Sequence, residues 1–67
     1  MTEQQQNWLK DYVDHYDTHV EYRAYIKHKD DGKVWTHHIM PWTSYERFLE
    51  IIGDGELVEL NGHKFEN

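Results

Sequence analysis

The chain contains six histidines among its 67 residues, and two of them have the spacing of a metal site. His15 and His19 are four residues apart, which places two imidazoles on one face of a helix. With Asp14 or Asp17 they form the first ligand set to consider, because imidazole and carboxylate groups both bind divalent metals. The chain has no His-Glu-x-x-His pattern, however, and His19 is expected to lie past the end of the helix. We therefore predict exposed histidines that pair with carboxylates, and no metal site.

Catalytic residues are harder to find in this sequence. Ser44 is expected at the start of a helix, and no glycine-rich nucleophile elbow surrounds it. The segment from Gly53 to Gly55 lacks the lysine and the preceding strand of a phosphate-binding loop. The chain has no cysteine, which excludes disulfides, thiolate metal sites and thiol nucleophiles. The sequence therefore predicts a protein that is not an enzyme and has no cofactor.

Residues in the middle of the chain have the composition of a protein–protein interface. Tyr, Trp, Met and Arg are enriched at such interfaces, and all four occur on or just beyond one predicted strand face. The predicted partner-binding residues are Arg23, Tyr25, Lys27, Thr36, His38, Met40 and Trp42. A purely structural alternative is that Tyr25 packs across the sheet on His38 and on the lysine side chains.

A β-hairpin from His19 to Met40 is expected to position these residues. Apolar and polar residues alternate along it, which is typical of a strand with one buried face. Asp31-Gly32 predicts a two-residue turn. The opposing pairs would then be Lys29–Val34, Ile26–His37 and Ala24–Ile39. The residues facing the core would be Val20, Tyr22, Ala24, Ile26, Trp35 and Ile39, with Lys27 exposed on the other side.

A helix is expected before the hairpin. Thr2 and Gln5 have the spacing of a capping box, and the helix should end near Asp17 or Thr18. Its apolar residues recur at the spacing of one helical face. They are Trp8, Leu9, Tyr12, Val13 and Tyr16.

A second helix and a second hairpin are expected after Pro41, which cannot donate to a strand ladder. Thr43 and Glu46 predict the start of the helix. Its buried face would consist of Tyr45, Phe48, Leu49 and Ile52, with Ile51 at the margin. Asn61-Gly62 then predicts a tight turn that places Leu60 opposite His63 and Val58 opposite Phe65. The inward residues would be Val58, Leu60 and Phe65, with Leu57 on the wrong parity and Glu59, Lys64 and Glu66 outward.

Together these elements predict an α+β fold with the order α-β-β-α-β(-β). An antiparallel sheet of three or four strands would carry both helices on one face. A chain of 67 residues has room for a single domain, here residues 1–67. The lack of cysteine in so small a domain favours a reducing, cytoplasmic location, and no apolar run reaches membrane-spanning length.

The net charge of -6 makes direct binding to nucleic acid unlikely, because such binding requires a basic surface. The first hypothesis is a small non-enzymatic protein-binding module, such as an accessory or inhibitor protein of phage or mobile-element type that occupies a partner's surface. The alternative is a structural homo-oligomer, of which a homodimer is the simplest form. Two weaker alternatives are a DNA mimic using Asp11, Asp14 and Asp17, and a histidine-based metal binder.

Overall fold

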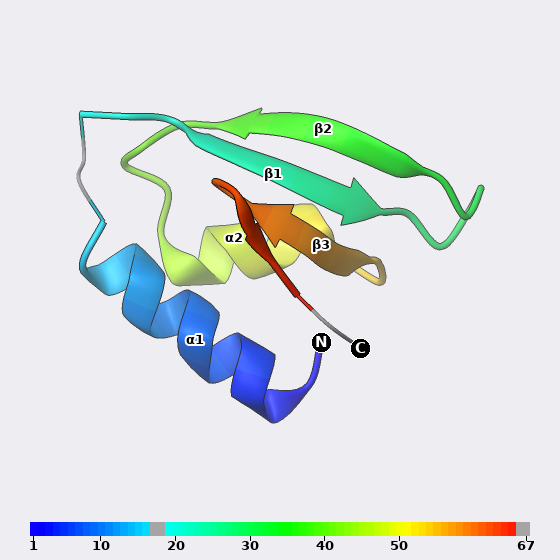
Figure 1. Cartoon of the computed structure of the whole chain (residues 1–67), viewed down its shortest axis with the longest axis horizontal. Coiled ribbons are helices and arrows are strands. Elements are labelled where there is room, and N and C mark those ends of the chain that lie inside the picture. The colour runs from blue at the N-terminus through cyan, green and yellow to red at the C-terminus, as the bar shows by residue number, and fades with distance from the viewer. Residues whose placement is uncertain (17–18, 66–67) are drawn as a thin grey trace.

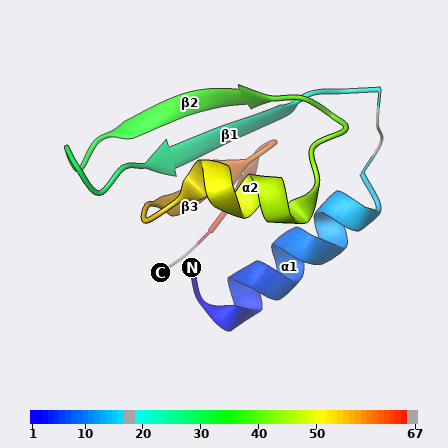
Figure 2. The same ribbon diagram turned by 180° about the vertical axis from the view of Figure 1, so that it is seen from behind.

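The computed structural model describes residues 1–16 and 19–65 of the chain. The elements in chain order are α1 (Glu3–Asp14), β1 (Tyr22–Lys27), β2 (Val34–Ile39), α2 (Tyr45–Ile52), β3 (Glu56–Leu60) and β4 (His63–Lys64). The strands form one antiparallel sheet in the order β2-β1-β3-β4. Both helices lie on the same side of this sheet (Figures 1 and 2). The predicted α+β fold is therefore confirmed, with four strands.

One apolar cluster lies between the sheet and the two helices. Leu9 enters it from α1, and Phe48 and Ile52 enter it from α2. The strands contribute Tyr22, Ala24, Ile26, Ile39, Leu57 and Leu60. Both helices use this face of the sheet, and within the described residues no helix covers the opposite face (Figure 1). Within the described residues, neither helix has the length and apolarity needed to cross a membrane.

The start of α1 follows the predicted capping box. The backbone N–H of Gln5 donates to Thr2 Oγ1 at 3.2 Å, and the N–H of Thr2 donates to Gln5 Oε1 at 3.0 Å. The helix ends at Asp14, earlier than predicted. His15 has already left helical geometry, and the ring of Tyr16 stacks on Tyr22 with centroids 3.9 Å apart. The predicted end points, residues 17 and 18, lie outside the described residues.

The register of the central hairpin differs from the prediction by two residues. The observed pairs are Tyr22–Ile39, Arg23–His38, Ala24–His37, Tyr25–Thr36, Ile26–Trp35 and Lys27–Val34. The predicted pairs Lys29–Val34, Ile26–His37 and Ala24–Ile39 are therefore wrong. A shift of two residues restores the original side-chain parity, so every strand residue keeps its predicted face.

The cause of this shift is a longer loop. The N–H of His28 donates to Lys33 O, and the N–H of Gly32 donates to His28 O, each at 2.9 Å. Four residues therefore separate His28 from Lys33. A two-residue type I′ turn needs positive φ at both central residues, and here Gly32 has a φ of 67° whereas Asp31 does not have a positive φ. The predicted tight turn at Asp31-Gly32 is thus replaced by a four-residue loop.

Trp35 is not buried, contrary to the prediction. It lies on the helix-facing parity, opposite buried Ile26, but its side chain is 52 % exposed. The hairpin extends beyond the area that the helices cover (Figure 1). Trp35 belongs to the first half of β2, where all three residues are exposed. Val20, also predicted to face the core, is exposed because it precedes β1. Lys27 is exposed as predicted.

Helix α2 begins one residue later than predicted. Ser44 is its N-cap, and Ser44 Oγ accepts a hydrogen bond from the N–H of Arg47 at 3.2 Å. Thr43 lies outside the helix and its N–H donates to Met40 O, which closes a turn after β2. The predicted apolar face is correct. Phe48 and Ile52 are buried, and the residues packed at its margin are Tyr45, Leu49 and Ile51.

The Asn61-Gly62 turn forms as predicted. Asn61 and Gly62 have φ values of 48° and 90°, and the strands pair Leu60 with His63. Phe65 N–H donates to Val58 O at 2.9 Å, in the predicted register.

The parity of Leu57 is explained by a β-bulge. Strand β1 pairs Tyr25 with Glu59 but Ile26 with Leu57, so Val58 is the extra residue. The bulge lets both Leu57 and Leu60 reach the core, while Val58, predicted to face inward, is only half-buried. Glu66, predicted to face outward, lies outside the described residues.

Candidate binding surface

The uncovered side of the β1–β2 hairpin carries most of the predicted partner-binding residues. Since side chains alternate along a strand, the burial of Tyr22, Ala24 and Ile26 places their neighbours on the other side. We call this surface the open face. Its residues are Arg23, Tyr25 and Lys27 on β1, and Val34, Thr36 and His38 on β2. The structure thus brings together five of the seven predicted partner-binding residues, and Val34 lies on the same face.

Cross-strand pairing fixes the layout of charge on the open face. Arg23 lies opposite His38, and Lys27 lies opposite Val34. Within the described residues, neither Arg23 nor Lys27 forms an ion pair. Tyr25 lies between them on β1, opposite Thr36, and is half-buried. The open face therefore has an aromatic centre flanked by two cations, and Glu56 lies opposite Lys27 on the β3 side.

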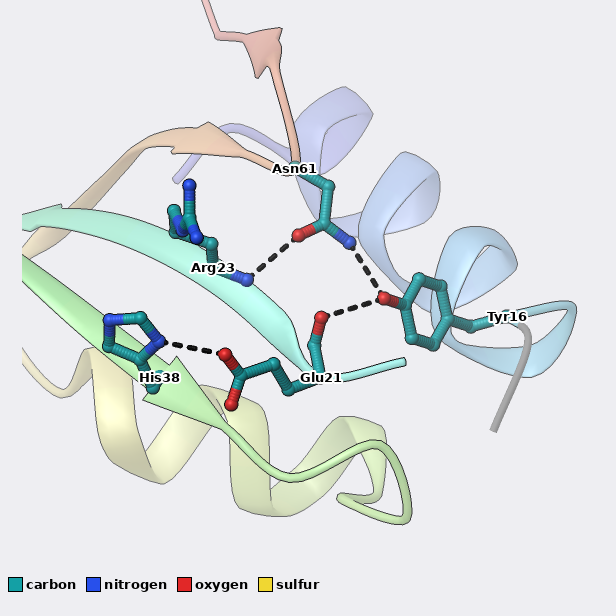
Figure 3. Close-up of polar contacts among 5 residues, drawn as sticks. All are labelled: Tyr16, Glu21, Arg23, His38 and Asn61. Carbon is teal, nitrogen blue, oxygen red and sulfur yellow. Dashed lines mark hydrogen bonds and ion pairs between the residues drawn. The ribbon is translucent and has the colours of Figure 1, made fainter. Parts of the chain in front are cut away.

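His38 has a carboxylate partner beside the open face. Its Nδ1 lies 3.0 Å from Glu21 Oε1, and both side chains are about half exposed (Figure 3). Glu21 precedes β1, so this contact links the end of β2 to the start of β1. For His38, this arrangement matches the predicted pairing of histidines with carboxylates.

Asn61 holds the start of β1 in place, a role that the sequence analysis missed. Its Oδ1 accepts from the N–H of Arg23 at 2.7 Å, and its own N–H donates to Arg23 O. Its Nδ2 donates to the hydroxyl groups of Tyr12 and Tyr16, each at 3.1 Å. Tyr16 in turn donates to Glu21 O at 2.9 Å (Figure 3). The turn residue thereby connects α1 to the backbone that carries Arg23 and Glu21.

A shallow hollow adjoins the open face between β1 and β3. Its volume is about 410 Å³, and Arg23, Tyr25 and Glu59 line it. Glu59 pairs with Tyr25 across the two strands. The hollow thus offers a cation, an anion and an aromatic surface, a combination suited to binding one side chain of a partner.

Met40 and Trp42 lie beyond the open face. Both are in the turn that follows β2, which the Thr43 N–H to Met40 O bond closes. Both are exposed, and Trp42 is 75 % exposed. The structure therefore separates these two predicted residues from the strand pairs, and places them as an apolar extension at the Ile39 end of β2.

The histidines are spread over the molecule, and among residues 1–16 and 19–65 His28 and His37 are the two that contact each other. His15 Nδ1 lies 2.8 Å from Asp11 O, and this backbone hydrogen bond together with the Asp11 charge raises the pKa of His15. His28 and His37 share a hydrogen bond between their Nε2 atoms at 2.9 Å, which requires one of the two to carry the proton. In this part of the chain, no group of three or more His, Asp or Glu residues is placed to hold a metal ion. Asp17, one of the candidate ligands, lies outside it.

Comparison with known proteins adds no relative: no family model, no curated protein and no solved structure matches the chain.

Proposed function

We propose that this protein is a non-enzymatic binding module that holds a partner protein against the open face of its sheet. The observation that carries the proposal is the exposed β1–β2 surface, on which Tyr25 lies between Arg23 and Lys27, two cations that form no ion pair within residues 1–16 and 19–65. A solvated face is common in antiparallel sheets, but the mixture of aromatic and basic residues here is typical of interfaces. Exposed Met40 and Trp42 extend that composition past the end of β2.

The geometry of Ser44 supports the non-enzymatic part of the proposal. Ser44 is the only serine in the chain, and its Oγ is used as a helix cap that accepts from Arg47 N–H. The hollow beside Tyr25 is wide and open to solvent, whereas catalytic groups usually lie in pockets that exclude water and shift pKa values.

Charge favours an acidic partner surface. The segment from Tyr22 to Met40 has an excess of two positive charges, although the whole chain carries -6. Its charged residues are Arg23, Lys27, Lys29, Lys33, Asp30 and Asp31. Carboxylates border the open face at the start of β1, where Glu21 contacts His38, and along β3, where Glu56 and Glu59 pair with Lys27 and Tyr25. Charges farther away than about 8 Å are largely screened at physiological salt, so an acidic group of the partner is favoured on the β2 side of Arg23 and Lys27. An accessory or inhibitor role of phage or mobile-element type stays a prediction.

Affinity capture with matched charge variants tests the proposal. Wild type and two double variants, Arg23→Gln/Lys27→Gln and Lys10→Gln/Lys64→Gln, are immobilised and exposed to a lysate of the source organism. Both variants remove two positive charges, but only the first does so on the open face; Lys10 and Lys64 are exposed on α1 and β4. We expect one protein to be retained by wild type and by the control variant, and lost with Arg23→Gln/Lys27→Gln. Equal retention by all three would contradict the proposal.

A structural homo-oligomer is the second candidate, and the position of β2 at the edge of the sheet favours it. Self-association is tested by light scattering at two protein concentrations. A mass near 8.2 kDa at both would exclude this candidate, whereas a mass that rises to a multiple would support it.

A further inference from the structure

We infer that the free edge of β2 accepts an extended segment of the partner as a fifth strand, and that this segment alternates acidic and apolar residues. The inference rests on the proposed function and specifies how the partner is held. Strand addition at a sheet edge is an established mode of peptide recognition, in which backbone hydrogen bonds give affinity and alternate side chains give specificity.

The hydrogen-bond alternation of the β1–β2 ladder shows which backbone groups of β2 are free. The His28 N–H bonds to Lys33 O, so bonded pairs recur at every second position from there. The residues of β2 that bond to β1 are Trp35, His37 and Ile39, and those directed to the free edge are Val34, Thr36 and His38. The hydrogen bonds of Arg23 support this assignment. Its N–H and C=O both bond to Asn61, on the side of β1 away from β2, so they do not bond to His38 opposite.

Strand β2 has none of the features that usually protect an edge. Natural edges are shortened, bulged, or interrupted by charged residues and proline. Strand β2 has six residues, pairs with β1 without a bulge, and contains no proline, glycine or formally charged side chain. The other edge, β4, has two residues. Among residues 1–16 and 19–65, no backbone bond reaches the free side of β2.

The two faces of β2 determine the side chains of the added strand. On the open face, the new strand would lie beside Val34 and His38, one strand away from Lys27 and Arg23. Long acidic side chains at these positions can reach both cations. On the opposite face the new strand would lie beside Trp35, which is 52 % exposed and can pack against an apolar residue. The segment therefore alternates acidic residues on one side with apolar residues on the other.

A second copy of the chain fits the edge less well. The paired edge is six residues long, about 20 Å at strand spacing. Such an edge covers well below the roughly 800 Å² per partner of a stable interface. An extended peptide can pair with a six-residue edge without a further contact surface. The size of the edge therefore favours a segment of the partner over a second copy of the chain.

Amide hydrogen exchange measured by NMR tests the inference, with a synthetic eight-residue peptide of alternating Glu and Val as the probe. We expect the amides of Val34, Thr36 and His38 to exchange at least ten times more slowly in its presence, and those of Trp35 and His37 to change little. Two control peptides should fail to protect these amides. One replaces Glu by Lys, and the other carries N-methyl groups along its pairing edge.

A variant of the protein provides a second control. Val34→Pro removes an outward N–H at the first residue of an edge strand, where proline is tolerated. We expect at least tenfold weaker binding of the Glu–Val peptide than with Val34→Ala, with protection of Ile26 unchanged as a check on folding. Equal binding by the two variants would overturn edge pairing.

The remaining outcomes separate this inference from the proposed function. If the Glu–Val peptide shifts signals of Arg23 and Lys27 without protecting the edge amides, the open face binds but the edge does not pair. If the peptide does not bind at all, the inference is wrong, and the affinity-capture result decides the proposed function independently. Protection that appears without peptide and grows with protein concentration would identify a second copy as the occupant and overturn the inference.

Discussion

The indole Nε1–H of Trp35 donates a hydrogen bond to Asp31 Oδ2 at 3.1 Å, and so ties an exposed aromatic residue of β2 to the hairpin loop. The other carboxylate oxygen of Asp31 accepts from the N–H of Lys33 at 2.9 Å. One side chain therefore holds both the loop and the beginning of the free edge. Since Trp35 has no helix covering it, this contact is an important constraint on its position.

Acid should loosen the hairpin loop. The hydrogen bonds from Lys33 N–H and from the Trp35 indole lower the pKa of Asp31 below its ordinary value of 3.8. The stability that Asp31 contributes is complete above pH 3.8 and is lost as the pH falls through this lowered pKa. NMR between pH 5 and pH 2 should show the Trp35 indole proton exchanging faster at the acid end. Asp31→Asn cannot titrate, so an identical acid response in that variant would contradict the assignment.

Alkali should destabilise the core through Tyr22. Burial raises the pKa of Tyr22 from 10.0 to about 12, with smaller contributions from Tyr16 and Tyr12. Its phenol then ionises more readily in the unfolded chain, so the stability it contributes is complete below pH 10 and falls between pH 10 and 12. Urea denaturation at pH 9 and pH 11 should show a smaller loss of unfolding free energy for Tyr22→Phe than for wild type. An equal loss in both would contradict this role.

Two aromatic residues that were expected in the core, Phe48 and Trp35, should differ in their contribution to stability. Phe48 is 0 % exposed, and Phe48→Ala should lower the free energy of unfolding by about 3–5 kcal/mol. Trp35 is half exposed, so Trp35→Ala should cost about 1–2 kcal/mol through lost packing and the lost Asp31 bond. Chemical denaturation measures both values. If Phe48→Ala fails to fold, Phe48→Leu should still cost more than a surface substitution. Equal losses for the two alanine variants would show that Trp35 is buried in solution.

Gly55 should not tolerate a side chain. A Cβ at this position would lie 2.5 Å from Lys27 O and 3.1 Å from Ile52 O, and these are backbone atoms that cannot rotate away. Gly55→Ala should therefore destabilise the protein by about 1–3 kcal/mol. Asp54→Ala, at the exposed neighbouring position, should change stability by less than about 0.5 kcal/mol. Thermal denaturation of the two variants makes the comparison, and equal midpoints would contradict the close approach of β3 to β1.

Local signals in the sequence predicted those parts of the fold that depend on neighbouring residues. The Thr2–Gln5 capping box and the Asn61-Gly62 turn each act within a few residues, and both form as predicted. The prediction of a two-residue turn at Asp31-Gly32 was wrong, because a glycine with positive φ also suits a four-residue loop. The predicted faces of the hairpin residues were still correct, since the register of β1 and β2 shifted by an even number of residues.

Features that depend on distant packing could not be read from the sequence. The exposure of Trp35 depends on where the helix layer ends, and the burial of Leu57 depends on a bulge against β1. The role of Asn61 depends on hydrogen bonds to Tyr12 and Tyr16, which are far away in the sequence. Strand parity alone determines that five of the predicted residues share the open face, whereas Met40 and Trp42 follow the strand into a turn. That these residues bind a partner stays a prediction.

Site-specific photo-cross-linking tests most directly whether a partner lies on the open face. A benzophenone-bearing phenylalanine analogue replaces Thr36 on the open face or, as the control, Glu46 on the exposed side of α2. After illumination in a lysate of the source organism, we expect a cross-linked species of one defined mass from position 36. That species should be absent from position 46 and lost when Arg23→Gln/Lys27→Gln is added. A cross-link from position 46 with none from position 36 would show that the partner lies on the helix side, and would contradict binding at the open face.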